Sequence, residues 1–488
     1  MANLTKDDIR NVIEIIKELY LEDMIPWICG YSGGKDSTAV VQLVWYALME
    51  LPKEKLKKTV HVISTDTLVE SPVVDIWSSE SLVKMEQSAK ENGLPIIPHR
   101  LTPEITNTFW VNLIGRGYPY PRRDFRWCTD RMKIDASNRF IKSVLDAESE
   151  AIMVLGSRKA ESAARKAVLE GYEKKRYRAH LSPNGSFPNS YVFTPIENWS
   201  NDNVWQYLVQ VPNPWGHSNK DLLAMYSGAS ADGECPLVLD TNTPSCGNSR
   251  FGCWVCTMVT EDKSMAAMIQ NDEEKSWMLP MLEFRNEIAA DWQTDRDRRE
   301  FRRKDGRLTW HNNRLVHGPY TKDAREYFLR RLLEVEKLVH EIGPDEIKDV
   351  PLIRMDELRF IRQIWLDEKH EFDDSLPRIY EEVTGKKYDD GTISKNKYFG
   401  AEESELLESV CRELYPDEEL LSEMQRALLD TEAKAAAISN KRNVILNFEK
   451  EIKKAFYRDE AEAEEIAERR ARRASGATED IDAGDFVE

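Results

Sequence analysis

The amino-acid sequence predicts an α/β fold in which a parallel-sheet domain is followed by a cysteine-rich loop region and a helical C-terminal part. Three observations support this prediction. Up to about residue 160, short β-rich apolar runs alternate with segments of helical periodicity. From about Asn184 to Thr260 the chain is rich in Pro, Asn, Ser, Gly and Trp and holds four cysteines. From Lys263 onward, helical patterns dominate.

The predicted sheet domain has strands and helices in alternation. The segments Thr38–Leu51 and Val73–Glu91 have the apolar spacing of helices. The runs predicted as strands are Ile25–Tyr31, Thr59–Thr65, Ile96–Leu101 and Ala151–Gly156. Because such alternation produces a parallel sheet covered by helices, we expect ligands at the carboxyl ends of the strands.

Two apolar stripes mark the helical part. The first ends at Gly343 and Pro344, a pair that predicts a helix stop, and consists of Phe328, Leu332, Val335, Val339 and Ile342. The second predicts half of a helical hairpin or a surface for a partner, and consists of Ile445, Phe448, Ile452 and Phe456. The final residues, 475–488, have the composition of a disordered tail.

The composition is that of a globular protein. Of the 488 residues, 41% are hydrophobic and 32% are charged, which allows two or three domains and a sizeable core. The longest mostly apolar stretch, Ala39–Met49, is interrupted by Gln42 and is shorter than the roughly 20 residues that a membrane span needs. The N-terminal residues lack the apolar core of a signal peptide, so we expect a cytoplasmic protein.

The chain is strongly acidic, with a formal net charge of −18. Affinity for a polyanion is driven largely by counterion release, so this balance argues against tight, unaided binding to DNA or to an anionic membrane. A local basic groove, or delivery of nucleic acid by a partner, remains compatible with it.

The segment ICGYSGGKDSTAVVQLVW carries the strongest local signal. Its two glycines let backbone amides approach a phosphate, and the following helix points its free N–H groups and positive dipole end at the same place. The lysine would neutralise phosphate charge, and the serine hydroxyls would donate hydrogen bonds. The predicted phosphate-binding loop consists of Ser32, Gly33, Gly34, Lys35, Asp36, Ser37 and Thr38.

This loop differs from a Walker A loop. Cys29 stands where the first glycine of that motif belongs, and Asp36 replaces the Ser or Thr after the lysine. Asp36 is suited to orient either a magnesium ion or the helix end. The alternative interpretation of the whole segment is a glycine turn between a strand and a helix, with Lys35 solvated.

A second segment, VLGSRKAESAAR, supports an anion site. Gly156 ends a predicted strand, so Arg158 and Arg165 are candidates to face the same crevice and bind phosphate or sulfate. The alternative is an ordinary helix N-terminus with solvated arginines.

Four cysteines lie close together in the loop-rich segment, with the spacing C-x10-C-x6-C-x2-C. Four thiolates in such a stretch fit either a [4Fe–4S] cluster or structural zinc, and the spacing alone does not decide between the metals. The predicted metal ligands are Cys235, Cys246, Cys253 and Cys256.

Cys128 lies in RRDFRWCTDRMK, among several cations. Neighbouring positive charges lower the pKa of a thiol, and the thiolate is the nucleophile, so Cys128 is a candidate for covalent chemistry. The surrounding cations are Arg122, Arg123, Arg126, Arg131 and Lys133.

These motifs resemble those of known enzymes. SGGKDS resembles the loop of the PP-loop ATP pyrophosphatases, which cleave ATP between the α- and β-phosphates and adenylate an oxygen. VLGSRKAESAAR resembles an element of the PAPS-reductase branch, and the region of Cys128 resembles R-x-C-C-x-x-x-K of PAPS and APS reductases with one cysteine in place of two. With VISTDTLVESPVV, NPWGHSNKDLL and TPSCGNSRFGCWVCT, residues from about 10 to 330 resemble the DndC sulfurtransferase family of bacterial DNA phosphorothioation.

The resemblance implies an adenine nucleotide alpha hydrolase-like fold and an ATP-dependent sulfurtransferase that adenylates a DNA phosphate and inserts sulfur. Lys35 and Asp36 would then act at the nucleotide, and Cys128 would carry a persulfide. Cys29 is either a second sulfur carrier or a small buried apolar residue. The implied cofactors are ATP, Mg²⁺ and a [4Fe–4S] cluster, which the resemblance favours over zinc. The implied partners are DNA, a cysteine desulfurase and other subunits of a phosphorothioation complex.

DNA would require a local basic surface. Two stretches, Arg116–Lys133 and Arg296–Arg314, combine cations with aromatic side chains, which suits phosphate contact and base stacking. Their alternative interpretation is solvated helix faces with embedded core aromatics. The residues predicted to contact phosphate or DNA are Arg122, Arg123, Arg126, Arg131 and Arg165.

On this interpretation the chain has five segments. They are an ATP-binding domain at 1–183, a cluster-binding region at 184–262, a helical and basic region that completes the site at 263–390, an acidic helical tail at 391–474, and the disordered end at 475–488. Rival functions are a PAPS or APS reductase, a tRNA-thiolating enzyme, and a non-catalytic assembly subunit stabilised by zinc.

Overall fold

The computed structural model describes residues 4–123, 125–229, 251–389, 399–418, 420–436 and 444–474. Contacts divide the chain into two units. Unit 1 comprises residues 1–109, 121–286 and 339–350, and unit 2 comprises 110–120, 287–338 and 351–488. Each unit is therefore assembled from stretches that are separated in the sequence.

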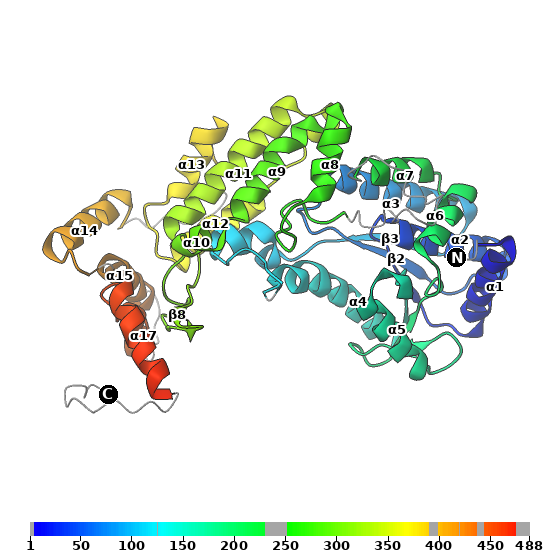
Figure 1. The fold of residues 1–488 in the computed structure, drawn as a ribbon, viewed down its shortest axis with the longest axis horizontal. Helices are drawn as coiled ribbons and strands as arrows, with labels where there is room; N and C mark the ends of the chain where they lie inside the picture. The colour runs from blue at the N-terminus through cyan, green and yellow to red at the C-terminus, as the bar shows by residue number, and fades with distance from the viewer. Residues whose placement is uncertain are drawn as a thin grey trace. The chain divides into compact units, whose positions relative to one another are not determined.

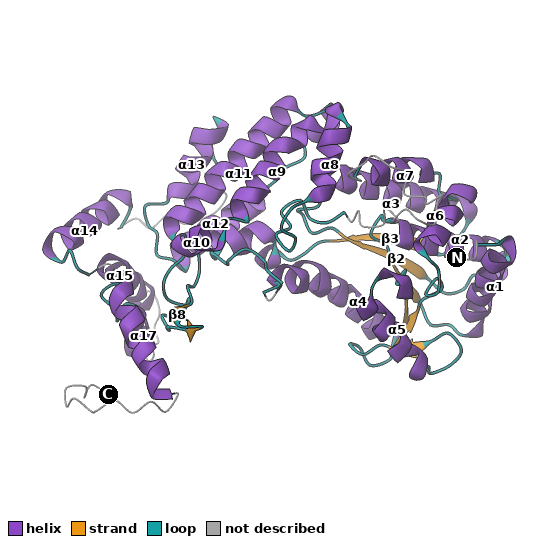
Figure 2. Cartoon of the chain, viewed as in Figure 1, coloured by secondary structure: helices purple, strands orange, loops and turns teal. Residues whose placement is uncertain are grey.

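Unit 1 contains a six-stranded sheet in the order β3-β2-β1-β4-β6-β5. All neighbours pair in parallel except β5 and β6, so the predicted parallel sheet is confirmed (Figure 2). The strands are β1 (Trp27–Gly30), β2 (Val60–Thr65), β3 (Ile96–Leu101), β4 (Ala151–Val154), β5 (Ser182–Pro183) and β6 (Ser190–Phe193).

Helices cover both faces of this sheet (Figure 1). Successive strand residues point to opposite faces, so Trp27 and Cys29 join one apolar core while Ile28 joins the other. The first core is covered by α1 (Lys6–Glu22), α2 (Lys35–Met49), α3 (Pro72–Asn92), α6 (Asn201–Gln210) and α7 (Asn219–Gly228). The second is covered by α4 (Asp135–Glu148) and α5 (Ala163–Lys174).

The predicted helices after the first and second strands are present within a few residues of their expected ends. Thr38–Leu51 corresponds to α2 and Val73–Glu91 to α3. α3 begins on Pro72, whose fixed φ suits the first helical turn, and ends at Gly93 in the left-handed region. The first helix, α1, which Thr5 caps through the amide of Asp8, was not predicted.

The rest of the described chain is helical, as expected from residue 263 onward. Its helices are α8 (Lys263–Asn271), α9 (Leu279–Ile288), α10 (Trp292–Asp297), α11 (Lys322–Ile342), α12 (Met355–Asp367), α13 (Ser375–Thr384), α14 (Ala401–Leu414), α15 (Leu421–Ala436), α16 (Val444–Lys454) and α17 (Glu460–Ala474). Helix α11 ends just before the predicted stop at Gly343. Of the five apolar residues predicted to form a stripe on this helix, four are buried and Ile342 is exposed. A short hairpin, β7 (Trp310–His311) and β8 (Arg314–Leu315), lies in unit 2.

Within unit 2, the C-terminal helices pack against the basic stretch. Phe301 and Leu315 form an apolar cluster with Tyr457, Ala463 and Ala467. The predicted stripe Ile445–Phe456, which begins on α16 and ends beyond it, stays largely outside the core: Ile445 and Phe456 are 72% and 68% exposed. Among the described helices, none has both the length and the apolar character that crossing a membrane requires.

Candidate active site

A cavity of about 520 Å³ opens in unit 1 at the carboxyl ends of β1 and β2. This is the edge of a parallel sheet where ligands are expected. Its wall includes the loop Ser32–Ser37, the end of β2 at Ser64–Asp66, and side chains from α3, α7 and the segment after β4. The predicted phosphate loop therefore faces a space large enough for a nucleotide.

The glycines of the loop are required by its geometry. Gly33 has φ +70°, and a Cβ there would lie 3.3 Å from the Cβ of Ser78. Gly34 precedes the first turn of α2 and has no side chain to cap it; of the first amides of α2, that of Lys35 donates to the Tyr226 hydroxyl. The Ser37 hydroxyl donates to the Gly34 carbonyl at 3.0 Å and lies 3.2 Å from the Ser32 hydroxyl, which holds the loop closed.

Lys35 and Asp36 belong to a buried charge network. Lys35 Nζ lies 3.2 Å from Asp36 Oδ2, and burial lowers the pKa of this lysine against the opposing effect of Asp36. The other oxygen, Asp36 Oδ1, accepts from Arg158 Nε at 2.7 Å. Asp36 thus anchors two cations, whereas the sequence left its role open between a magnesium ion and the helix end.

The segment after β4 reaches the same loop. A Cβ on Gly156 would lie 3.0 Å from the backbone of Asp36, so the segment after β4 is in close backbone contact with the start of α2. Arg158 is 3% exposed and also donates to the Trp199 carbonyl, so its side chain supports Asp36 besides lining the cavity. Arg165 does not line the cavity; it is exposed on α5, with Glu161 3.8 Å away.

The opposite wall carries charged residues that sequence reasoning did not single out. Arg100 at β3 bridges Asp66 at the end of β2 and Asp75 on α3, at 2.7 Å from each carboxylate. Burial, reinforced by the charge of Asp66, raises the pKa of Asp75. Asp66 directly follows a predicted strand, and this position at the sheet edge is the signal that could have identified it.

Two aromatic residues also hold the loop and were missed. The indole Nε1 of Trp77 donates to the Gly33 carbonyl at 3.2 Å. The Tyr226 hydroxyl accepts from the Lys35 amide at 3.4 Å. These contacts join positions that are 44 and 191 residues apart, so no local pattern could reveal them.

Cys128 stands at the start of a π-helical turn, Thr129–Ile134, that runs directly into α4. Its pKa is raised, chiefly by burial and also by the nearby Cys256 thiol, although a hydrogen bond with Thr129 opposes the shift. The predicted lowering of this pKa is therefore wrong: Arg131 donates to Asn107, and the Arg126 guanidinium to the Arg123 carbonyl.

Lys133, five residues beyond Cys128, lines the cavity. Its ammonium lies 3.4 Å from the Glu70 carboxylate, and the negative charge of the Cys253 thiolate is the main cause of its raised pKa. The end of the cavity at Lys133 and Glu70 is thus adjacent to the thiols Cys253 and Cys256. Of the predicted DNA-contacting arginines, Arg123 and Arg126 are exposed and Arg122 is half-buried.

Two of the four predicted metal ligands lie in the described chain. Cys253 pairs by backbone with Glu70, and its sulfur is 3.3 Å from the Thr67 hydroxyl, so this turn docks on the loop after β2. The Cys256 amide closes the turn on the Cys253 carbonyl at 2.9 Å. Burial raises the pKa of Cys253 to about 12, so a bound metal ion would be needed to keep this thiolate charged.

Cys235 and Cys246 lie outside the described residues. Within the described ranges, no three His, Cys, Asp or Glu side chains are arranged to hold a metal ion. The two soft donors Cys253 and Cys256 fit the thiolate half of an iron–sulfur or zinc site, and completing such a site depends on the other two cysteines.

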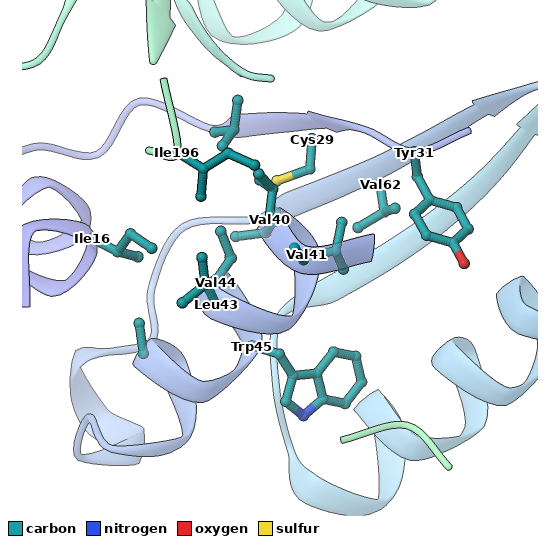
Figure 3. Close-up of a cluster of buried hydrophobic side chains, with 14 of the residues drawn as sticks. Ile16, Cys29, Tyr31, Val40, Val41, Leu43, Val44, Trp45, Val62 and Ile196 are labelled. Atoms are coloured by element: carbon teal, nitrogen blue, oxygen red, sulfur yellow. The ribbon is translucent and has the colours of Figure 1, made fainter. Parts of the chain in front are cut away.

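Cys29 lies in the apolar core between β1 and α2, beside Val40 and Ile196 (Figure 3). Its side chain has no solvent exposure, and burial raises its pKa to about 12. Of the two interpretations offered by the sequence, this environment matches the small buried apolar residue and disfavours the sulfur carrier.

Two arginines of the second basic stretch, Arg296–Arg314, form ion pairs with the C-terminal helices within unit 2. Arg296 lies 2.6 Å from Glu460 of α17. Arg302 is 5% exposed, donates to the Lys454 carbonyl at 2.6 Å and pairs with Glu423 of α15. Acidic C-terminal helices thus neutralise cations that the sequence offered as a DNA surface.

Comparison with known proteins identifies one part of the chain. Residues 26–214 match the family model described as the phosphoadenosine phosphosulfate reductase domain. The uncharacterised protein MJ0066 of Methanocaldococcus jannaschii is 30% identical over 210 residues, which are 42% of this chain and 36% of that protein. The chain thus spans about a third of the length of this curated relative.

Three solved structures show distant likeness. FMN adenylyltransferase of Candida glabrata, in complex with FAD and inorganic pyrophosphate, has 13% identity and a TM-score of 0.27, covering 50% of this chain and 73% of its own. PAPS reductase of Candida auris, a phosphate complex, has 14% identity and a TM-score of 0.25, with coverages of 44% and 91%. The U34-tRNA thiolase NcsA of Methanococcus maripaludis, with its [4Fe–4S] cluster, has 13% identity and a TM-score of 0.28, with coverages of 59% and 79%.

Proposed function

Residues 26–214 form a PAPS reductase-like domain, and on this premise we propose that the chain is an ATP-dependent sulfurtransferase that places sulfur on the DNA backbone. The observation that carries the proposal is the layout of one cavity. The phosphate loop forms one wall, and Lys133 and Glu70, the neighbours of Cys253 and Cys256, form another. Nucleotide activation and sulfur delivery would then share a single space.

The charge of the cavity fits a nucleotide bound with a metal ion. Among the described residues, four cations and five carboxylates line it, a net charge of 4 − 5 = −1. A triphosphate would not be attracted to such a wall without a divalent cation that offsets its charge, which supports a role for Mg²⁺. The lining charges are Lys35, Arg100, Lys133, Arg158, Asp36, Asp66, Glu70, Asp75 and Glu161.

The proposed reaction has two displacements. A non-bridging oxygen of a DNA phosphate attacks the α-phosphorus of ATP, the bond to the β-phosphate breaks, and pyrophosphate leaves. The terminal sulfur of a persulfide on Cys128 then attacks the adenylated DNA phosphorus, and AMP leaves. A second thiol cleaves the remaining S–S bond, so that sulfur stays on the DNA and the two thiols become a disulfide. Lys35 and the α2 amides would stabilise the charge that develops on the phosphates.

The partners belong to the same proposal. A cysteine desulfurase would supply the persulfide sulfur, and further subunits would present DNA to this acidic chain. Exposed Arg123 and Arg126 are available for phosphate contact near Cys128. When bound at the four cysteines, a [4Fe–4S] cluster would supply thiolate-ligated iron for sulfur handling or hold the loop in shape.

The deciding experiment is mass spectrometry of DNA from cells that carry the wild-type chain or Lys35→Ala. We expect sulfur-containing dinucleotides with the wild type and their loss with the variant, accompanied by loss of pyrophosphate release from ATP. Lys166→Ala, on the exposed surface of α5, serves as the matched control because neither Lys166 nor its partner Glu170 lines the cavity. Unchanged sulfur content with Lys35→Ala would contradict the proposal.

A second candidate, a PAPS reductase, is favoured by the family match itself. It predicts that the purified chain releases sulfite from PAPS with a thiol reductant and needs no ATP. The acidic wall of Asp66, Glu70 and Asp75 favours ATP bound with Mg²⁺, because carboxylates suit the divalent cation that a triphosphate binds. Measuring both activities on the same preparation separates the two functions.

A further inference from the structure

The turn that follows α5 gathers positive charge on the surface of unit 1. Over residues 174–178, four of the five side chains are cationic and none is acidic, in a chain whose net charge is −18. Lys174, Lys175, Arg176 and Tyr177 are all exposed. These four residues are called the basic turn below.

The two lysines of the basic turn are not neutralised by the protein. Within the described part of the chain, neither Lys174 nor Lys175 has a side-chain ion pair or hydrogen bond. Arg176 is partly neutralised, since it lies 3.1 Å from Glu197 and 3.9 Å from Glu173. The charge of the two lysines is therefore available to the phosphates of a ligand.

Tyr177 adds an exposed aromatic ring to these cations. The residue is 68% exposed, and its ring stacks on that of Tyr191 with the centroids 5.1 Å apart and the planes at 29°. Tyr191 lies on β6, and its hydroxyl donates to the Glu150 carboxylate at 3.0 Å. One face of the Tyr177 ring is thus supported by the protein, and the exposed part can stack on a nucleic-acid base.

Backbone contacts give the turn a defined shape. The Tyr177 amide donates to the Leu181 carbonyl at 2.9 Å, and the Leu181 amide donates to the Arg178 carbonyl at 3.1 Å. Arg178 pairs with Asp23 and lies 3.4 Å from Glu22 of α1, so this cation anchors the turn to the domain. A surface held in place before binding loses less conformational entropy when a ligand binds.

Helix α5 connects the basic turn to the nucleotide cavity. Glu161 lines the cavity and lies two residues before α5, and Lys174 is the last residue of this helix of 12 residues. The helix therefore spans about 18 Å. A nucleic-acid strand covers this length with roughly five nucleotides, at about 3.4 Å each. A short strand is thus long enough to reach from the cavity wall to the basic turn.

We propose that the basic turn is a contact surface for single-stranded DNA, in which a base stacks on Tyr177 and neighbouring phosphates lie against Lys174 and Lys175. The choice of DNA rests on the proposed function. The supported, exposed ring favours an unpaired strand, because the bases of a duplex are stacked on one another and offer no free face to a side chain.

The test measures binding of a fluorescent oligothymidylate to the full-length chain by anisotropy, without ATP and at several salt concentrations. Tyr177→Ala should weaken this binding about tenfold, because base stacking is lost, and should leave the affinity for a duplex of equal length unchanged. The double variant Lys174→Ala, Lys175→Ala should reduce the salt slope of the binding constant for the single strand by about 1.4, since two phosphate contacts are lost.

Matched controls remove the same groups elsewhere. Tyr415→Ala removes another exposed ring, in unit 2. The double variant Lys220→Ala, Lys263→Ala removes two exposed lysines from α7 and α8. Both controls should bind the oligothymidylate with the affinity and salt slope of the wild type.

Each outcome bears on the surface or on the proposed function. Failure of the wild type to bind the oligothymidylate, or a Tyr177→Ala variant that binds it as tightly as the wild type, would overturn the proposal. Equal weakening for single strand and duplex would also overturn it, and tighter binding of an oligouridylate would assign the surface to RNA. Binding that depends on the basic turn, together with unchanged sulfur content in Lys35→Ala, would uphold the surface and refute the proposed function.

Discussion

At the scale of single residues, Gly33 shows how closely the phosphate loop depends on missing side chains. Its φ of +70° is costly for an L-residue, and its carbonyl accepts from the Trp77 indole. An added methyl group would also press on Ser78. The conformation that aims the α2 amides at the cavity is therefore accessible to glycine and to few other residues.

We predict that Gly33→Ala lowers the free energy of unfolding by about 1 kcal/mol and weakens ATP binding, because the loop must relax away from its anion-binding shape. Gly171→Ala is the matched substitution: this glycine lies inside α5 with no atom within 4 Å of the added Cβ, so it should stabilise the chain by about 0.5–1 kcal/mol. Urea unfolding and ATP titration of both variants measure the contrast. A Gly33→Ala variant as stable and as tight-binding as the wild type would contradict it.

The buried pair of Asp36 and Arg158 carries the second prediction at this scale. Asp36→Asn removes the charge that balances Arg158, which is 3% exposed. We expect a loss of roughly 2 kcal/mol in the free energy of unfolding, less than for a fully buried pair, since Asp36 keeps some solvent contact. Glu170→Gln, which breaks the exposed pair with Lys166, should change stability by less than about 0.5 kcal/mol. Equal effects of the two substitutions would refute the assignment.

At the scale of elements, the predictable parts were those whose signals are local. The strand, glycine turn and helix around Ser32 follow one another in the sequence, so their order predicted β1, the loop and α2. The contacts of Tyr226 and Trp77 with the loop could not be predicted, because α7 and α3 reach the loop only through tertiary packing. The sequence also failed to predict the raised pKa of Cys128, because cations close to it in the sequence, Arg126 and Arg131, make their hydrogen bonds with other groups in the fold.

Strands β2 and β3 also bring two histidines together. His61 Nδ1 lies 3.0 Å from His99 Nε2, and Phe140 packs on both rings. Burial, with a smaller contribution from His99, lowers the pKa of His61 to about 4, and burial lowers that of His99 as well. Neither ring is therefore suited to accept a proton while the sheet remains folded.

The sheet should consequently lose stability in mild acid. As the pH falls from about 6.5 toward 4, the unfolded chain gains a proton on His61 before the folded chain does, so unfolding becomes easier over this window. The contribution that the neutral His61 makes to the free energy of unfolding is fully present above about pH 6.5. Urea midpoints at pH 7.5 and pH 5 should differ less in His61→Gln than in the wild type, whereas His311→Gln, at an exposed position, should keep the wild-type difference. The same pH dependence in all three proteins would show the prediction to be wrong.

At the scale of the whole molecule, part of the acidic excess forms ion pairs with arginines of the same chain. The sequence alone could show that Arg296–Arg314 is basic and that the C-terminal helices are acidic, but not that the two pair. Glu423 and Glu460 come from helices that no motif identified, and their contacts with Arg302 and Arg296 arise only when unit 2 is folded. In the first basic stretch, Arg123 is exposed.

This difference predicts opposite consequences for two arginines. Arg302→Ala should lower the free energy of unfolding by about 2 kcal/mol, through loss of its hydrogen bonds to Glu423 and Lys454, without a specific effect on DNA affinity. Arg123→Ala should leave stability unchanged, weaken DNA binding and reduce the salt slope of the binding constant by about 1. Thermal unfolding and binding at several salt concentrations, in the presence of partner subunits, measure both. If the salt dependence of DNA binding fell in Arg302→Ala and not in Arg123→Ala, the roles given to the two arginines would be wrong.

The division into units has a consequence for how the chain is made. The polypeptide passes from one unit to the other five times, after residues 109, 120, 286, 338 and 350. Cleavage at one peptide bond therefore cannot separate the two units. During synthesis, unit 1 is complete only after residue 350 has been translated. The described residues that line the cavity end at Phe251, so a nascent chain that stops at the last cysteine of the loop region, Cys256, already contains this wall but lacks the remaining parts of unit 1, which include residues 339–350.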